Sequence, residues 1–183
     1  GQNGTGPSLG PRVRDLMALG ADAETALRVV ASASPHIDYR QLTAVDAAGV
    51  GAAFSGNRVL GVYGSARATN VACAGNLLAT DRVPRDMTDA FGDAAGHLGD
   101  RLVAALRAGL AAGGEEGPVH SAGLMLVDRV SWPVADLRVD WDDDPVNRLA
   151  ALWRLYRPQL DDYVARAVNP SAAPGYGVPG ESR

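Results

Sequence analysis

The spacing of the apolar residues changes period several times along this chain, and the order of the changes restricts the folds that it can adopt. Apolar residues first recur at helical spacing, and from Arg40 they alternate as they do in strands. Helical spacing then returns, with a leucine every four residues from Leu98 to Leu110. Two strand-like runs and a final helix follow. Because helical blocks flank strands that hairpins can join, this order predicts a layered α/β (α+β) sandwich built on antiparallel sheet.

The expected elements can be given as residue ranges. Helices are expected over residues 11–20, 22–34 and 83–112. A last helix is expected from residue 145, and Pro158 kinks or restarts it. Strands are expected over residues 41–45, 50–55, 58–63, 70–75, 119–130 and 134–139. Asp22 and Asp144 are expected to cap the helices that follow them. Residues 1–168 are predicted to form a single domain, and residues 169–183, rich in Pro, Gly and Ser, a loose tail.

Composition narrows the classes of function. The chain has 183 residues, of which 46% are hydrophobic and 21% charged, as in a globular domain. Its formal net charge of -4 argues against a nucleic-acid partner, and the lack of a long apolar run argues against a membrane span. Cys73 is the single cysteine, so no internal disulfide can form, and core filling is its expected role. A reducing compartment fits this usage, and we expect a cytoplasmic protein.

Several familiar motifs are absent, and we expect neither a cofactor nor a metal. The sequence has no Gly-x-Ser-x-Gly elbow, Walker loop, His-Glu-x-x-His or Cys-x-x-Cys. The run Gly49-Val50-Gly51 lies in a predicted hairpin rather than before a helix, which makes a dinucleotide site a poor interpretation. The acidic run of residues 142–144, with Asp140 before it, could form a metal cluster. Helix capping is the simpler interpretation, because the spacing of a calcium loop is missing.

Polar residues near strand ends are the candidates for a site. His120 and Ser121 are neighbours on a predicted strand, so their side chains point to opposite faces and cannot form a catalytic pair, although one of them could face a pocket. Asp136, Arg138 and Asp140 share one face of a predicted strand, roughly 6.5 Å apart. They form either a solvated ladder of charges or the charged wall of a pocket.

Two further positions stand at element boundaries. Asn76 follows a predicted strand, where its side-chain amide could donate to a developing oxyanion or simply make a turn. Arg40 and Gln41 lie in a polar run at a helix-to-strand junction. Arg40 could bind a substrate carboxylate, or the run could tie a loop down.

Eight short strings together carry a resemblance to a known family. In chain order they are Gln2-Asn3 with Leu9-Gly10-Pro11, Asp38-Tyr39-Arg40-Gln41, Val45-Asp46, Phe54-Ser55-Gly56, Gly75-Asn76-Leu77-Leu78, Ala112-Gly113-Gly114, His120-Ser121-Ala122 and Asp136-Leu137-Arg138-Val139-Asp140. In this order and spacing the chain resembles the domain of unknown function 1028 family, which is grouped with N-terminal-nucleophile (Ntn) hydrolase-like folds. The resemblance runs from Gln2 to about Tyr163.

The resemblance implies a four-layer αββα sandwich of two mainly antiparallel sheets, with about two strands before Gln2 in full-length relatives. In Ntn hydrolases the first residue of the mature chain is a Thr, Ser or Cys whose own α-amino group is the base. Gly1 has no side chain, so we expect a truncated member whose nucleophile is absent. The implied activity is hydrolysis of an amide (C–N) bond in a small amide or ureido-like molecule. The alternative is a non-catalytic ligand-binding or assembly module on the same fold.

The site that this resemblance implies has seven members. Asn76 is the expected oxyanion donor, and Gln2, Asn3, Arg40, Gln41, Ser121 and Arg138 are expected to line the substrate pocket. Lost edge strands would leave backbone unpaired, so a homo-oligomer such as a dimer is also expected. The expected partners are thus a small-molecule substrate and further copies of the chain.

Overall fold

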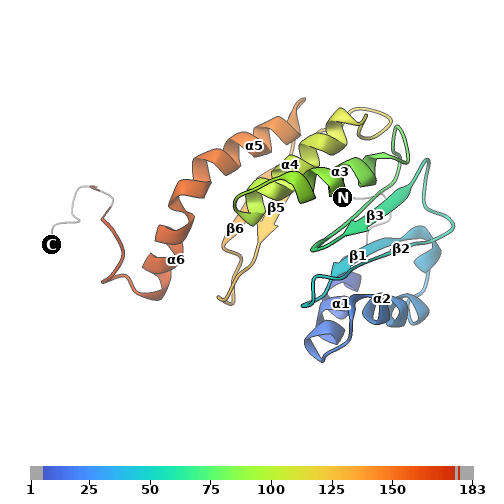
Figure 1. Cartoon of the computed structure of the whole chain (residues 1–183), viewed down its shortest axis with the longest axis horizontal. Coiled ribbons are helices and arrows are strands. Elements are labelled where there is room, and N and C mark those ends of the chain that lie inside the picture. Colours follow the sequence, from blue (N-terminus) through green and yellow to red (C-terminus); the bar gives the residue numbers. More distant parts are fainter. Residues whose placement is uncertain (1–5, 176, 178–183) are drawn as a thin grey trace. The chain divides into compact units, whose positions relative to one another are not determined.

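The computed structural model describes residues 6–175 and residue 177, and Figure 1 shows their elements. Gln2 and Asn3 lie outside the described residues. The chain divides into two compact units, Gly1–Val119 and His120–Arg183, and each is described by itself. The single domain predicted over residues 1–168 therefore stays a prediction.

The first unit contains helices at both ends of its sequence and two hairpins between them. Its elements are α1 (Leu9–Ala18), α2 (Ala23–Ser32), the 3-10 turn η1 (Ile37–Tyr39), β1 (Gln41–Val45), β2 (Gly51–Ser55), β3 (Gly64–Ala68), β4 (Val71–Gly75), α3 (Val83–Asp93) and α4 (Leu98–Ala111). Strands β1 and β2 pair antiparallel, as do β3 and β4. The predicted α/β class with antiparallel sheet is confirmed.

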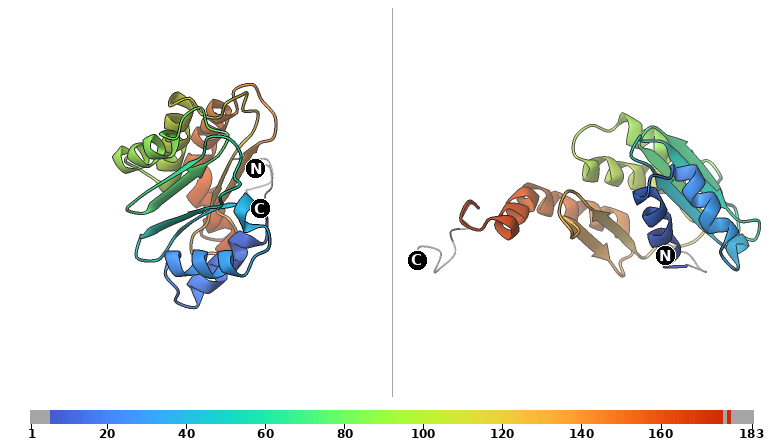
Figure 2. Two further views of the ribbon diagram at one scale, coloured as in Figure 1. Left: turned by 90° about the vertical axis from the view of Figure 1, so that its right-hand side faces the viewer. Right: turned by 90° about the horizontal axis from the view of Figure 1, so that it is seen from below.

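The two hairpins of the first unit face one another between two layers of helix. Strand β1 contacts β4, and β2 contacts β3. Helix α2 packs on β1 and β2, with α1 beside it, while α3 packs on β3 and β4 and carries α4. Two further views show the pair α1 and α2 on one side of the strands and the pair α3 and α4 on the other (Figure 2). The order within this unit is helices, sheet, sheet, helices.

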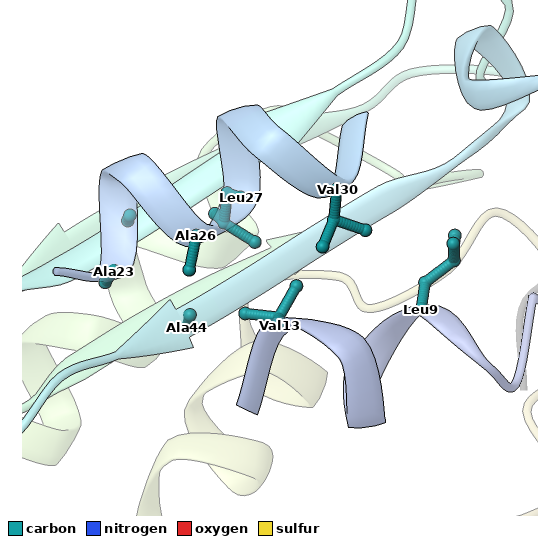
Figure 3. Packing of buried hydrophobic residues seen from close by; sticks show 8 residues of the cluster. Leu9, Val13, Ala23, Ala26, Leu27, Val30 and Ala44 are labelled. Atoms are coloured by element: carbon teal, nitrogen blue, oxygen red, sulfur yellow. The ribbon is translucent and has the colours of Figure 1, made fainter. Parts of the chain in front are cut away.

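Small side chains let α1 and α2 approach the first hairpin closely. The buried cluster there consists of Leu9, Val13, Ala23, Ala26, Leu27, Val30, Ala44 and Ala52 (Figure 3). Asp22 caps α2 as predicted, since its carboxylate accepts from Thr25 N–H at 2.7 Å. A second cluster between β4 and the later helices contains Val71, Phe91 and Ala105. Cys73 packs against it, and burial raises the pKa of its thiol to about 11.

The two hairpins are joined at their tips. Asp46 closes the β1–β2 turn by accepting from the backbone N–H groups of Ala48 and Val50, both at 3.0 Å. The N–H of Asn70, in the β3–β4 turn, donates to the carbonyl of Gly49 at 2.8 Å. A β-carbon at Gly51 would lie 2.7 Å from the carbonyl oxygen of Val71, so the backbones are too close for a side chain at that position.

The second unit is a hairpin covered on one face by helix. Its elements are β5 (Ala122–Leu126), β6 (Ala135–Val139), α5 (Pro145–Tyr156), the 3-10 turn η2 (Arg157–Gln159) and α6 (Leu160–Val168). Helix α5 contacts both strands, and Leu124, Leu126, Leu149 and Trp153 are buried. The helix restarts at Pro158 as predicted, because proline cannot supply the N–H that a continuous helix needs there.

Three predicted element boundaries are wrong. Residues 58–63 are irregular, and the strand lies at Gly64–Ala68, because Gly61 has a φ of +65° that breaks an extended run. The helix expected over residues 83–112 is two helices, separated where Gly96 has a φ of +98° and His97 caps α4 by accepting from Gly99 N–H at 3.1 Å. The strand expected over residues 119–130 covers only Ala122–Leu126.

None of the helices that the structure describes combines the length and the apolar character needed to cross a bilayer.

Candidate functional site

Asn76, directly after β4, carries a buried side-chain amide, with only 7% of the residue exposed. Its Nδ2 donates to the carbonyl oxygen of Leu60 at 3.5 Å. The backbone N–H of Leu77 donates to the same oxygen at 3.1 Å. Two N–H donors on neighbouring residues therefore converge on a single carbonyl oxygen.

The turn that holds these donors contains a residue with a positive φ and is connected to neighbouring segments by backbone hydrogen bonds. Leu77 has a φ of +52°, in the left-handed region that bulky residues rarely adopt and that is enriched at functional sites. Leu78 N–H donates to Val62 O at 2.9 Å, and Glu116 N–H donates to Leu77 O at 2.7 Å. A β-carbon at Gly61 would lie 3.1 Å from Leu77 Cα, so the two segments are in close contact. These bonds hold the backbone of the turn, including the N–H of Leu77.

Gln41 links the two hairpins at the end where Asn76 lies. Its Nε2 donates to Ser55 Oγ at 3.0 Å and to the Gly64 carbonyl at 3.4 Å. Gly64 is the register partner of Gly75, the residue before Asn76. Ser55 was not predicted as a site residue, although its place at the end of a strand is the kind of signal that identified Asn76.

The segment before Gln41 is tied to the loop that follows β2. Arg40 O accepts from Gly56 N–H at 2.9 Å, and Asp38 O accepts from Arg58 N–H at 2.8 Å. Arg58 also donates to the hydroxyl of Tyr39 at 2.9 Å. These contacts support the loop-tying interpretation for the backbone. The Arg40 side chain is half-buried and makes no ion pair within the described part of the chain, so its guanidinium remains free to bind an anion.

His120 and Ser121 precede β5 in the second unit and form no hydrogen bond with each other among the residues described. The imidazole of His120 stacks on the ring of Trp141 with centroids 4.2 Å apart. Its Nδ1 lies 3.3 Å from Asp142 O and 3.7 Å from Asp143 Oδ1. Ser121 is exposed.

The described acidic residues of the second unit lie mainly on its surface. Asp136 and Arg138 are exposed on one face of β6, and Asp140 is exposed just after it. Asp144 stands at the N-cap of α5, but its carboxylate accepts from the side chain of Asn147 instead of from the helix backbone, which corrects the capping prediction. Over residues 6–175 and 177, no three His, Cys, Asp or Glu side chains are arranged to hold a metal ion.

The predicted site residues thus fall into separate groups. Arg40, Gln41 and Asn76 belong to the first unit, where Gln41 and Asn76 lie at the same end of the hairpins. Ser121 and Arg138 belong to the second unit. Their participation in one pocket stays a prediction.

A cavity that the sequence did not indicate lies at the tips of the two hairpins. Its volume is about 450 Å³, and it is lined by Glu24, Ala48, Gly49, Val50, Gly51, Arg67, Ala68 and Thr69. The wall includes the Gly49-Val50-Gly51 run that resembled part of a nucleotide motif. Glu24, on α2, lies far in sequence from Arg67 and Thr69, and only the packing of α2 and the hairpins brings them to one cavity, so no local pattern could have identified them.

Comparisons with known proteins point to a single family. The sequence model of DUF1028, a family of unknown function, matches residues 1–149. The crystal structure of protein SPO2555 from Silicibacter pomeroyi, also described as DUF1028, is similar to this chain with a TM-score of 0.77 and 29% sequence identity. That similarity covers 86% of this chain and 69% of the other. No curated protein matches the chain.

Proposed function

Because the chain belongs to DUF1028, a family of unknown function, we propose an activity from the geometry of its Asn76 turn: hydrolysis of an amide (C–N) bond in a small amide or ureido-like molecule. The observation that carries the proposal is the convergence of Asn76 Nδ2 and Leu77 N–H on one carbonyl oxygen. Two fixed donors aimed at one oxygen are what an oxyanion hole requires.

The burial of Asn76 makes this pair effective. In hydrolysis the substrate carbonyl oxygen takes the position that Leu60 O has in this structure, and it gains negative charge as the tetrahedral intermediate forms. The hydrogen bond from the buried Asn76 amide to that charge is strengthened by its burial, while Leu77 is exposed to solvent. Leu60 must move away before a substrate oxygen can take its place, while the bond from Glu116 N–H to Leu77 O holds the backbone at Leu77.

The nucleophile in this proposal is the N-terminal Thr, Ser or Cys of the mature natural protein, as in Ntn hydrolases. Its oxygen or sulfur attacks the amide carbon while its α-amino group takes the proton. The carbonyl electron pair moves onto the oxygen held by Asn76 and Leu77. Collapse then expels the amine, which takes the proton back, and water releases the acyl group. The packing order of the first unit supports the Ntn type by analogy of fold only.

The remaining residues have binding roles in this proposal. Arg40 pairs with an anionic group of the substrate, and Gln41 positions the strand ends through Ser55 and Gly64. In this proposal the residues that line the substrate pocket are Gln2, Asn3, Arg40, Gln41, Ser121 and Arg138. The proposal also places these residues within a single domain over residues 1–168.

The test uses the natural protein, whose mature N-terminal residue is first identified by mass spectrometry. Changing that residue to Ala abolishes turnover of a panel of small amides and ureido compounds. Asn76→Asp, nearly the same shape but unable to donate, lowers kcat by about 10²–10³-fold with a smaller change in KM. Asn57→Ala, at an exposed asparagine, leaves kcat unchanged. Rates are expressed per folded molecule from circular dichroism. Unchanged turnover in the N-terminal variant would end the proposal.

One observation favours a second candidate, a non-catalytic ligand-binding or assembly module. In this structure the Leu60 carbonyl already accepts from both donors, so they are not free. A thermal-shift screen run beside the amide panel separates the candidates. Ligands that raise the melting temperature of the natural protein without being turned over support the module.

We also propose self-association, with a dimer as the simplest form. Every sheet in the described part of the chain has two strands, so every strand is an edge with unpaired backbone groups. Sedimentation equilibrium of the natural protein tests this, and a monomer at all concentrations contradicts it. A cytoplasmic location is proposed from the single cysteine, and fractionation of the source cells tests it.

A further inference from the structure

The cavity at the hairpin tips is separate from the Asn76 turn. Each strand of the two hairpins has five residues, so the tips lie roughly 13 Å from the ends at which Gln41 and Asn76 stand. Among the described residues, none that is proposed for hydrolysis lines this cavity. A ligand bound there therefore has its own recognition chemistry.

Hydrogen bonds connect the segments that line the cavity. The Asp46 carboxylate holds the β1–β2 turn through Ala48 and Val50, and it also accepts from Ala23 N–H at 3.3 Å at the start of α2. The bond from Asn70 N–H to Gly49 O joins one turn to the other. The α2 wall and both hairpin tips are thus held together before any ligand arrives, which lowers the entropy cost of binding.

The cavity contains one free carboxylate and one free guanidinium. Glu24 lies in the first turn of α2, and Arg67 lies on β3; both are exposed. Neither side chain makes an ion pair or hydrogen bond within the described residues, although both line the same cavity. The neighbouring carboxylates are already engaged, because Asp22 accepts from Thr25 N–H and Asp46 from three backbone N–H groups.

We propose that this cavity binds a small zwitterion, of the size of an amino acid or dipeptide. Its carboxylate pairs with the Arg67 guanidinium, which offers two parallel donors, and its ammonium group pairs with Glu24. The aliphatic part lies against Ala48, Val50 and Ala68, and the Thr69 hydroxyl offers a further polar contact. A ligand with only one charge leaves the opposite charge of the cavity unpaired.

The volume and exposure of the cavity set the expected strength of binding. About 450 Å³ lies in the lower part of the range for small-molecule sites and suits a dipeptide. Because both charged groups are exposed, each pair is weak and screened by salt. Binding is therefore expected in the millimolar range, and it weakens as ionic strength rises.

Titration of the ¹⁵N-labelled natural protein with glycylglycine, followed by NMR, tests the proposal. Saturable shifts are expected for the amides of residues 48–51 and 67–69. N-acetylglycine, which has only the carboxylate, and glycinamide, which has only the ammonium group, should bind at least about tenfold more weakly, a difference of about 1.4 kcal/mol. Measuring binding rather than turnover keeps this result independent of the proposed hydrolase activity.

Two single substitutions and two controls complete the test. Glu24→Gln and Arg67→Gln each lower the affinity for glycylglycine to that of the singly charged compounds. The controls Glu116→Gln and Arg107→Gln, at exposed positions outside the cavity, leave that affinity unchanged. Both cavity side chains are exposed, so the folded spectrum is retained. The proposal is overturned if no saturable shift occurs, if the singly charged compounds bind as tightly, or if both Gln variants bind like the unaltered protein.

Discussion

Asp46, at the tip of the first hairpin, and Asn76, after the last strand of the second, both bind backbone groups but differ in what they contribute. The Asp46 carboxylate accepts three hydrogen bonds from backbone N–H groups, with N···O distances of 3.0 to 3.3 Å, and these bonds are well formed. Asn76 makes one bond of 3.5 Å through its amide, at the long limit of such contacts. Asp46 therefore mainly stabilises the fold. The Asn76 amide gains little from its present partner.

Substitution of Asp46 should lower stability in a pH-dependent way. Donation from Val50 N–H, and then from Ala23 and Ala48, holds the pKa of Asp46 below its ordinary value of 3.8. The folded-state pKa is thus the lower one, so the carboxylate stabilises the fold above about pH 3.8, and the effect is lost as pH falls through the folded-state value.

The Asp46 prediction is tested by thermal melting of Asp46→Asn at neutral and at acid pH. The melting temperature is lower than that of the unaltered protein at neutral pH, and the difference narrows in acid. The control is Asp93→Asn, at an exposed aspartate of α3. A difference that is the same at both pH values contradicts the role assigned to the charge.

At the scale of elements, two glycines should respond to the same substitution with opposite signs. Gly51 is in β2, where a β-carbon would lie 2.7 Å from the carbonyl of Val71, so Gly51→Ala pushes the hairpins apart at a cost of about 1–3 kcal/mol. Gly92 is an exposed residue of α3 with open space at its β-carbon position. Gly92→Ala therefore stabilises the protein by about 0.5 kcal/mol through helix propensity.

Urea unfolding of both glycine variants gives the free energies of unfolding directly. If Gly51→Ala is neutral, the tips of the hairpins are not in the close contact described. If Gly92→Ala brings no gain in stability, the helix that ends at Asp93 frays before residue 92.

Elements were predictable where neighbouring residues determine the backbone. The strand expected over residues 41–45 matches β1, and Asp22 caps α2 as its position before an amphipathic run indicated. The strand predicted over residues 58–63 is wrong, because the apolar run there is irregular. Gly61 adopts a positive φ there, set by contact with the turn at Leu77, sixteen residues later. Such a contact has no local signature.

The candidate site, like the elements, was predictable only where neighbouring residues in the sequence determine it. Asn76 could be identified from its place after a strand, but its pairing with Leu77 on one oxygen depends on Leu60 in a distant loop. Glu24 and Arg67 carry no motif at all, since exposed charged residues are common on any surface. What joins them is the packing of α2 and two hairpins, a property of the molecule rather than of any segment.

At the scale of the whole molecule, the single domain proposed over residues 1–168 has a direct spectroscopic test. All three tryptophans, Trp132, Trp141 and Trp153, belong to the second unit, so their emission reports on that unit alone. Leu27 is buried in the main cluster of the first unit. Leu27→Ala leaves a cavity there and is expected to cost about 2–5 kcal/mol.

If the two units unfold as one domain, Leu27→Ala shifts the unfolding midpoint measured by tryptophan emission and the midpoint measured by far-ultraviolet circular dichroism equally. The reason is that a two-state transition has one midpoint for every probe. Leu149→Ala, at a buried leucine of the second unit, should then move both signals together as well. The single domain is wrong if Leu27→Ala leaves the emission midpoint in place while circular dichroism resolves an earlier transition. In that case each unit has its own stability, and the residues proposed to line one pocket belong to separately folding parts.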